Sequence, residues 1–161
     1  MSATEDFWEF ASQTYEVEGV SGLCLRLQDE YELDVNILLF ILWCDQMGAG
    51  DVSPQFWKDL VSYSKKWQGE IVSPLRGARR ELKVRIANGL PHLQKLRQQV
   101  LSVELEAEKE QINHLQHLYN VSPTIREVTA QEMIRCYLSA LKLEADDTRD
   151  HLLKELVLIA V

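Results

Sequence analysis

Residues 34–44 read DVNILLFILWC, and this nearly unbroken apolar run decides the fold class. From Val35 to Cys44 the run is far shorter than the roughly 20 residues that cross a bilayer. Asp34 is a typical N-cap residue and Gly48 supplies a stop, so the run predicts a helix over residues 35–47. A helix that is apolar on nearly every side must be surrounded by others. We therefore predict a buried central helix.

Two Ser-Pro pairs, at residues 53–54 and 73–74, predict further helix starts. In each pair the serine hydroxyl can cap a helix whose first position is occupied by proline. We expect the second of these helices to end at Asn88-Gly89 and the longest helix to begin near Pro91.

The chain predicts one all-α domain, residues 1–161, built as a bundle of about six to eight helices. Thr129 and Glu132 have the spacing of a capping box before another helix. No alternating strand pattern of useful length and no internal repeat is visible. The connection near residues 120–128 is a candidate hinge before a terminal helical pair.

Composition indicates an ordinary globular protein, with 46% hydrophobic and 26% charged residues and a net charge of -8. The opening MSATEDFWEF has no basic region, so we expect no secretory signal. The three cysteines are far apart, which is typical of reduced thiols. We expect a cytoplasmic protein without a membrane span, a metal or a cofactor.

Charge is distributed unevenly along the chain. Residues 1–64 carry a net charge of -10, whereas residues 65–99 carry nine basic and two acidic residues. Arg76, Arg80 and Lys83 fall within about 60° of one another on a helix and form a basic ridge. The ridge predicts either contact with an anionic partner, including nucleic acid, or neutralisation by acidic helices of the same fold. The block lacks the interleaved aromatic residues typical of single-strand binders.

Polar side chains interrupt the apolar side of the longest predicted helix. Its apolar residues span an arc of about 180°, and Glu104, Glu108 and Gln111 fall inside that arc. Carboxylates facing a core need partners. Arg79 and Asn36 are the candidates, and the five residues together form a predicted polar centre.

Two interpretations of the polar centre remain open. It is either a buried network that fixes helix register or a pocket whose paired carboxylates perform acid/base work or hold a ligand.

Two further patterns have weak metal-binding interpretations. Glu110, His114 and His117 share a helix face, but an exposed face with three ligands is typical of a solvated surface. Asp146-Asp147-Thr148-Arg149-Asp150 spells the DDxxD of magnesium-dependent prenyl-diphosphate enzymes, yet aspartates in a first helical turn are explained by capping and the helix dipole.

Several blocks together resemble an uncharacterised bacterial family. They are the FW opening, LQD, DVN-Leu-Leu, LR-x-x-RR in SPLRGARRELK, and AE-x-x-Q in ELEAEKEQ, spread over about Phe7 to Leu118. The resemblance implies an all-α cytosolic protein without an assigned activity. It also implies that a small residue, often glycine, is usual at the position of Glu32.

These observations predict a non-enzymatic interaction or adaptor module with a protein partner. The first alternative is a ligand-binding or enzymatic bundle that uses the polar centre. A weaker alternative is binding of nucleic acid or a ribosome through residues 65–99.

Overall fold

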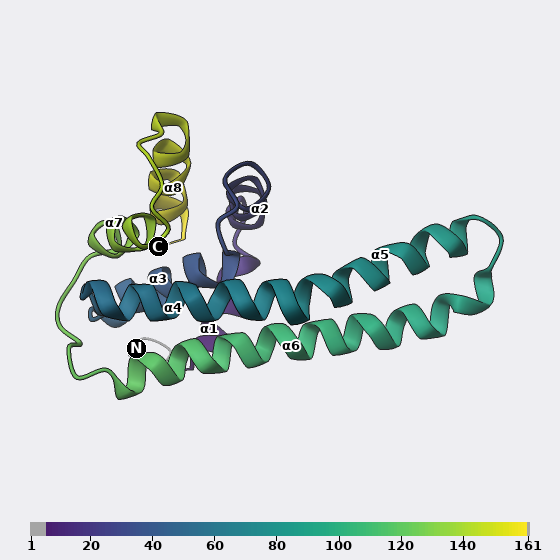
Figure 1. The fold of residues 1–161 in the computed structure, drawn as a ribbon. Coiled ribbons are helices and arrows are strands. Elements are labelled where there is room, and N and C mark those ends of the chain that lie inside the picture. Colours follow the sequence, from purple (N-terminus) through teal and green to yellow (C-terminus); the bar gives the residue numbers. More distant parts are fainter. Residues whose placement is uncertain (1–5, 161) are drawn as a thin grey trace. The chain divides into compact units, whose positions relative to one another are not determined.

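The computed structural model describes residues 6–160, which fold entirely as helices and connecting turns (Figure 1). The all-α prediction is confirmed. In chain order the helices are α1 (Phe7–Tyr15), α2 (Val20–Tyr31), α3 (Val35–Met47), α4 (Pro54–Trp67), the π-helix η1 (Gln68–Val72), α5 (Ser73–Ala87), the 3₁₀-helix η2 (Pro91–Leu93), α6 (Gln94–Val121), α7 (Ala130–Ala140) and α8 (Asp147–Ile159).

The described chain divides into two compact units, one of residues 6–61 and 112–160 and the other of residues 62–111. Helices α4 and α6 each begin in one unit and end in the other. Within the described range no helix is both long enough and apolar enough to span a membrane. The prediction of one domain with a hinge near residues 120–128 stays a prediction.

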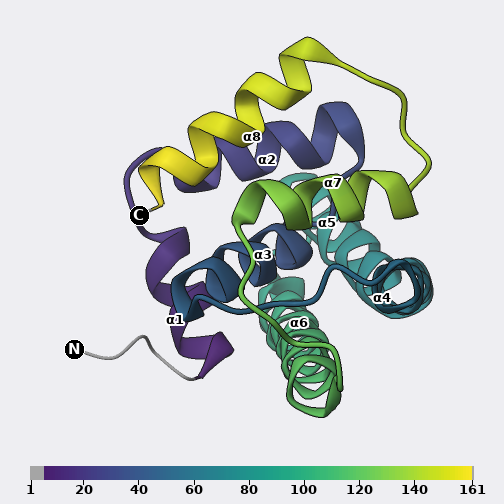
Figure 2. The same ribbon diagram turned by 90° about the vertical axis from the view of Figure 1, so that its left-hand side faces the viewer.

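Helix α3 is the buried core of the first unit, as the apolar run predicts. Every side chain from Ile37 to Cys44 is buried. The helix packs against α1, α2 and α7, and Figure 2 shows it enclosed by them. Phe7 of α1 stacks on Trp43 with ring centroids 5.3 Å apart, so aromatic contacts add to the burial of apolar surface.

The predicted signals define both ends of α3. The carboxylate of Asp34 accepts a hydrogen bond from the backbone N–H of Asn36 at 2.9 Å. Gly48 takes up the left-handed conformation, with φ of 73°, and ends the helix. The capping box of Thr129 and Glu132 at the start of α7 is confirmed as well.

The second unit is a helical hairpin. Helix α5 runs to a turn at residues 88–90, and α6 returns alongside it in the opposite direction (Figure 1). The chain reverses at Gly89, whose φ of 102° suits glycine. This turn follows the predicted stop at Asn88-Gly89.

Helix α5 begins at Ser73 with Pro74 in its first turn, as predicted, but the prediction that Ser73 caps a new helix end is wrong. The backbone is helical from α4 through η1 into α5, and the N–H of Ser73 bonds to the carbonyl of Gln68, five residues earlier. Proline has no N–H and its ring clashes with the preceding helical turn. The wider π turn accommodates that ring, so Pro74 lies inside a continuous helix.

Candidate functional site in the helical hairpin

The contact between α5 and α6 follows a coiled-coil pattern that we call the seam. Its members are buried or half-buried and are spaced alternately by three and four residues. They are Val72 at the end of η1, Leu75, Arg79, Leu82 and Ile86 on α5, Leu93 at the end of η2, and Arg97, Val100, Glu104, Ala107 and Gln111 on α6. Four seam positions are therefore polar or charged.

Glu104 is at the centre of the polar part of the seam, and its side chain is only 5% exposed. Arg79 Nε donates to Glu104 Oε2 at 2.5 Å, and Arg76 Nε donates to Glu104 Oε1 at 3.2 Å. Arg76 also reaches Glu108, whose Oε1 accepts from Nη2 at 3.1 Å. The two arginines thus hold two carboxylates in one network.

The network keeps Glu104 ionised. Burial alone raises the pKa of its carboxyl, but hydrogen bonds and charge from Arg79 and Arg76 outweigh burial, so the pKa lies below its ordinary value. The hydrogen bond to Glu104 raises the pKa of Arg79. A group held as a carboxylate in this way is a poor proton donor near neutral pH.

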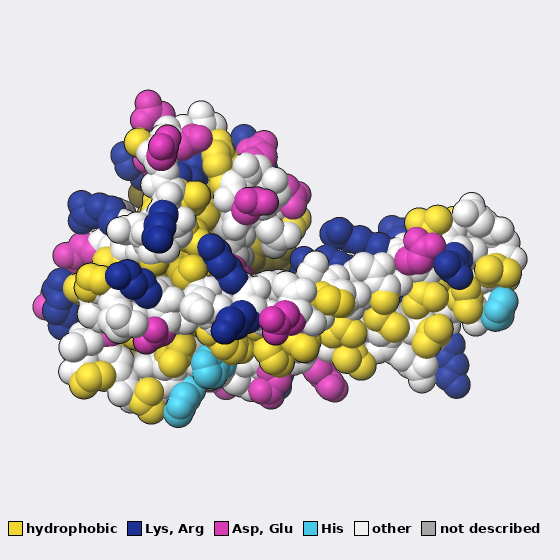
Figure 3. Space-filling view, in the orientation of Figure 1, with side chains coloured by type: hydrophobic (Ala, Val, Ile, Leu, Met, Phe, Trp, Pro, Cys, Tyr) yellow, Lys and Arg dark blue, Asp and Glu magenta, His cyan; other side chains and the backbone are white. Residues whose placement is uncertain are grey.

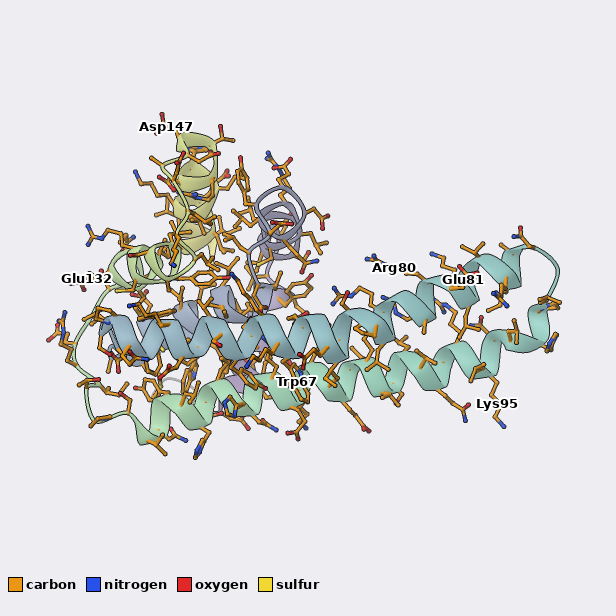
Figure 4. The ribbon with its side chains drawn as sticks, in the orientation of Figure 1. Trp67, Arg80, Glu81, Lys95, Glu132 and Asp147 are labelled. Carbon is orange, nitrogen blue, oxygen red and sulfur yellow. The ribbon has the colours of Figure 1, made fainter. Side chains whose placement is uncertain are left out.

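The polar seam continues toward η1. Gln111 is fully buried, and its Oε1 accepts from Gln68 Nε2 at 2.7 Å. Trp67 Nε1 donates to the carbonyl of Ala107 at 2.8 Å, and Figure 4 shows Trp67 between the two helices. Polar groups at this end of the seam are therefore paired within the chain. In the other direction lies Arg97, whose buried Nε has no hydrogen-bond partner within the described residues.

The structure assigns the predicted residues to the polar centre and to the basic ridge differently from the sequence analysis. Arg76 was assigned to the basic ridge, but it belongs to the network of Glu104. Arg80 and Lys83 remain exposed, and Figure 4 shows Arg80 on the side of α5 away from α6. Asn36 belongs to the other compact unit, so its role in the polar centre stays a prediction.

The hairpin exposes several large apolar side chains among its polar ones, which the sequence did not predict. Large apolar side chains are exposed throughout residues 62–111, and Figure 3 shows hydrophobic side chains gathered along the hairpin between α5 and α6. They are Ile71, Val84, Leu90, Leu96, Val103 and Leu105. The sequence did hold a cue to these exposed apolar residues. The apolar arc of the longest predicted helix spans about 180°, which is wider than the contact with one neighbouring helix requires.

Part of this surface forms a regular row beside the seam. Arg76 and Glu108, which follow the seam residues Leu75 and Ala107, are paired along one side of the hairpin. In the same repeat, the opposite side of the hairpin is therefore lined by the residues that stand one position before a seam residue. The seam residues concerned are Val72, Arg79, Ile86, Arg97, Glu104 and Gln111. The residues before them are Ile71, Ala78, Arg85, Leu96, Val103 and Glu110, all exposed, and we call them the outer row.

A second polar cluster, in the first unit, was missed from sequence. Asp51 is buried, and its carboxylate accepts from the Ser53 N–H at 2.7 Å, Ser122 Oγ at 2.5 Å and Thr124 Oγ1 at 2.6 Å. Its backbone carbonyl accepts from Trp57 Nε1. The Asp-x-Ser-Pro pattern at residues 51–54 is a local cue for an aspartate that caps a turn. Nothing in sequence links it to residues 122–124.

The described residues contain no group of three or more His, Cys, Asp or Glu side chains placed to hold a metal ion. Asp146 caps α8, because its carboxylate accepts the N–H of Arg149 at 2.9 Å. The side chain of Arg149 is buried and donates to Asp150 and to the carbonyl of Glu144. The structural interpretation of the Asp-rich motif therefore accounts for these residues.

Comparison with known families assigns the chain. The model of the family described as "Protein of unknown function (DUF2390)" matches residues 6–115, so the chain belongs to that family. This agrees with the uncharacterised family indicated by the sequence blocks. No curated protein and no solved structure matches the chain.

Proposed function

We propose that this member of the DUF2390 family is a non-enzymatic interaction module that binds a protein partner through the outer row of its helical hairpin. One observation carries the proposal. Ile71, Leu96 and Val103 expose between 39% and 50% of their surface along one side of a two-helix unit. Exposed large apolar side chains are unfavourable in water, and several of them on one side of a unit are typical of an interaction surface.

The geometry supports the adaptor over the alternative of a catalytic or ligand-binding centre. The carboxylate of Glu104 accepts three hydrogen bonds from two arginines of its own chain. A group so fully engaged has little capacity left for a substrate or a cation. We therefore interpret the polar centre as a device that fixes the register of α5 against α6.

The nucleic-acid alternative is weakened in a similar way. Arg76 is engaged with Glu104 and Glu108, so the ridge retains two of its three predicted members, Arg80 and Lys83. A bacterial origin and a cytoplasmic location are part of the proposal, since the sequence blocks and the reduced thiols favour them.

Site-specific photocrosslinking in cells tests the proposal. A photoreactive amino acid is placed at Val103, in the outer row, and separately at Ser102, which is exposed on the same helix but faces away from the seam. We expect covalent adducts of one defined protein, identified by mass spectrometry, from position 103 and none from position 102. Equal adducts from both positions, or none from either, would contradict a specific interaction through the outer row.

A further inference from the structure

A small hollow lies in the first compact unit, between the start of α4 and the second half of α7. Its volume is about 240 Å³, and half-buried Val52, Cys136 and Ala140 supply much of its lining. The two sides are in direct contact beside it, because Cys136 Sγ donates to the carbonyl of Val52 at 3.5 Å. The hollow is therefore formed by segments that pack on one another within one unit.

Two basic side chains reach the hollow from opposite sides. Lys58 comes from α4 and Arg135 from α7, and both are exposed. Within the described residues neither of them forms an ion pair, and no acidic side chain lines the hollow. Two uncompensated positive charges beside one hollow attract an anion.

Two acidic residues near the hollow are engaged with other groups. The charges of Asp51 and Glu132 both reach Cys136. The carboxylate of Asp51 accepts hydrogen bonds from Ser53, Ser122 and Thr124, and that of Glu132 accepts from Thr129 in the capping box. Neither acid pairs with Lys58 or Arg135, so both cations stay available to a ligand.

We propose that this hollow binds a small organic acid, whose carboxylate is held by Lys58 and Arg135 and whose short apolar body packs on Val52 and Ala140. A guanidinium matches a carboxylate in geometry as well as in charge. The volume lies below the roughly 300 to 1,000 Å³ of pockets for drug-sized ligands, so the acid must be smaller than such a ligand. The site is independent of the outer row and of its partner.

The apolar lining favours an organic acid over a bare inorganic anion. A phosphate ion would gain from the two charges alone, whereas an organic acid also buries apolar surface against the hollow. Hexanoate is therefore a suitable probe. Hexanamide has the same apolar body without the charge, and inorganic phosphate has charge without the apolar body, so these two compounds are matched controls.

Cys136 provides a reporter at the hollow. The other two thiols, Cys24 and Cys44, are fully buried, so alkylation of the folded protein is expected at Cys136. Iodoacetate is an anion and iodoacetamide is its neutral analogue, and both attack the same thiolate. Burial raises the pKa of Cys136, but the ratio of the two rates does not depend on how much thiolate is present.

The first measurement is this ratio, the rate with iodoacetate divided by the rate with iodoacetamide, followed by mass spectrometry of the peptide that contains Cys136. We expect Lys58→Gln and Arg135→Gln each to lower the ratio about two- to threefold, since each removes a charge that attracts the anionic reagent. Lys58 is the sharper test, because it is distant from Cys136 in sequence and acts only through the fold. Lys154→Gln, at an exposed position on α8, is the matched control and should keep the parent ratio.

The second measurement is protection of Cys136 from iodoacetamide at constant ionic strength. A ligand with so few atoms binds weakly, so we expect hexanoate to halve the rate at a concentration on the order of millimolar. Hexanamide and phosphate should protect at least about tenfold less, and the double variant Lys58→Gln and Arg135→Gln should lose the protection by hexanoate. Circular dichroism confirms that each variant is folded.

Three results would overturn the proposal. They are a rate ratio that Lys58→Gln leaves unchanged, equal protection by hexanoate and hexanamide, and no protection by hexanoate at ten times the expected concentration. Photocrosslinking at position 103 reports on the outer row alone, so failure there leaves these measurements unaffected.

Discussion

Replacing Asp51 tests whether its buried carboxylate holds the connection after α6 to the loop before α4. The carboxylate accepts three hydrogen bonds from Ser53, Ser122 and Thr124, and a hydrogen bond to a charged group contributes roughly 1.5 to 3 kcal/mol. The donors at 122 and 124 lie near the surface and regain water when the acid is removed. We therefore expect Asp51→Ala to lower the free energy of unfolding by about 3 kcal/mol, below the simple total of three such bonds.

Asp51→Asn should cost less, about 1 to 2 kcal/mol, because the amide keeps one acceptor oxygen and the two hydroxyls can rotate to accept from its NH₂. The assay is urea unfolding followed by tryptophan fluorescence, with melting temperatures as a second measure. For a chain of this size, 1 kcal/mol corresponds to a shift of about 2 to 4 °C. Asp59→Asn, at an exposed position bonded to Gln55, is the matched control and should change stability by less than about 0.5 kcal/mol.

The effect of Asp51 also depends on pH in a defined direction. Burial raises the pKa of Asp51, but hydrogen bonds from Ser122, Thr124 and Ser53 outweigh burial and hold the pKa below the ordinary value. A depressed pKa in the folded state contributes stability above the ordinary aspartate pKa of about 3.9, and this stability is lost as the pH falls through the folded value. The difference between parent and Asp51→Asn should therefore shrink below about pH 4. Equal stability of parent and Asp51→Ala at pH 7 would refute the reasoning.

Three other changes have expected outcomes. Glu104→Gln should lower the free energy of unfolding by about 2 kcal/mol in urea titrations, because Arg76 and Arg79, each about a fifth exposed, lose their main carboxylate partner. The side chain of Glu108 is 30% exposed, so Glu108→Gln should lower the free energy of unfolding by under about 1 kcal/mol. Equal losses from the two variants would contradict the central place of Glu104. Glu32→Gly should raise the melting temperature by about 1 to 3 °C, because Glu32 ends α2 with a φ of 56° that glycine adopts freely; a lower melting temperature would argue against strain there. The double variant Arg80→Glu and Lys83→Glu should melt like the parent and abolish any salt-sensitive gel shift with nucleic acid, and a parent that gives no shift at low salt ends the nucleic-acid alternative.

Sequence was sufficient to predict those features of a helix that are determined by residues within the helix and at its ends. Residues 34–48 contain the cap, the apolar surface and the stop of one helix, and α3 has the predicted bounds of residues 35–47. The position of Glu104 inside an apolar arc was likewise sufficient to predict a buried carboxylate that needs an arginine. Both inferences rest on neighbours within a few turns of one helix.

Features that depend on distant segments could not be predicted. The carboxylate of Asp51 meets hydroxyls more than seventy residues away, and no local pattern indicates which hydroxyls they are. Arg76 was grouped with Arg80 and Lys83 because all three share a helix face, but its long side chain reaches across the seam instead. Leu96 and Leu105 fell inside the predicted apolar arc yet are exposed, because periodicity indicates an apolar side without indicating what covers it.

The π turn of η1 preserves the rotational phase of everything that follows it in the hairpin. Buried Ser64 and buried Val72, the last residue of η1, are eight residues apart, one more than a regular seven-residue repeat. The wider turn takes up the extra residue. In a regular α-helix the same residues would turn α5 by about 100°, and Trp67 could not contact Ala107 while Arg79 contacts Glu104. Related chains that lack one residue in this segment are therefore expected to replace the π turn by a regular helix and to keep both contacts.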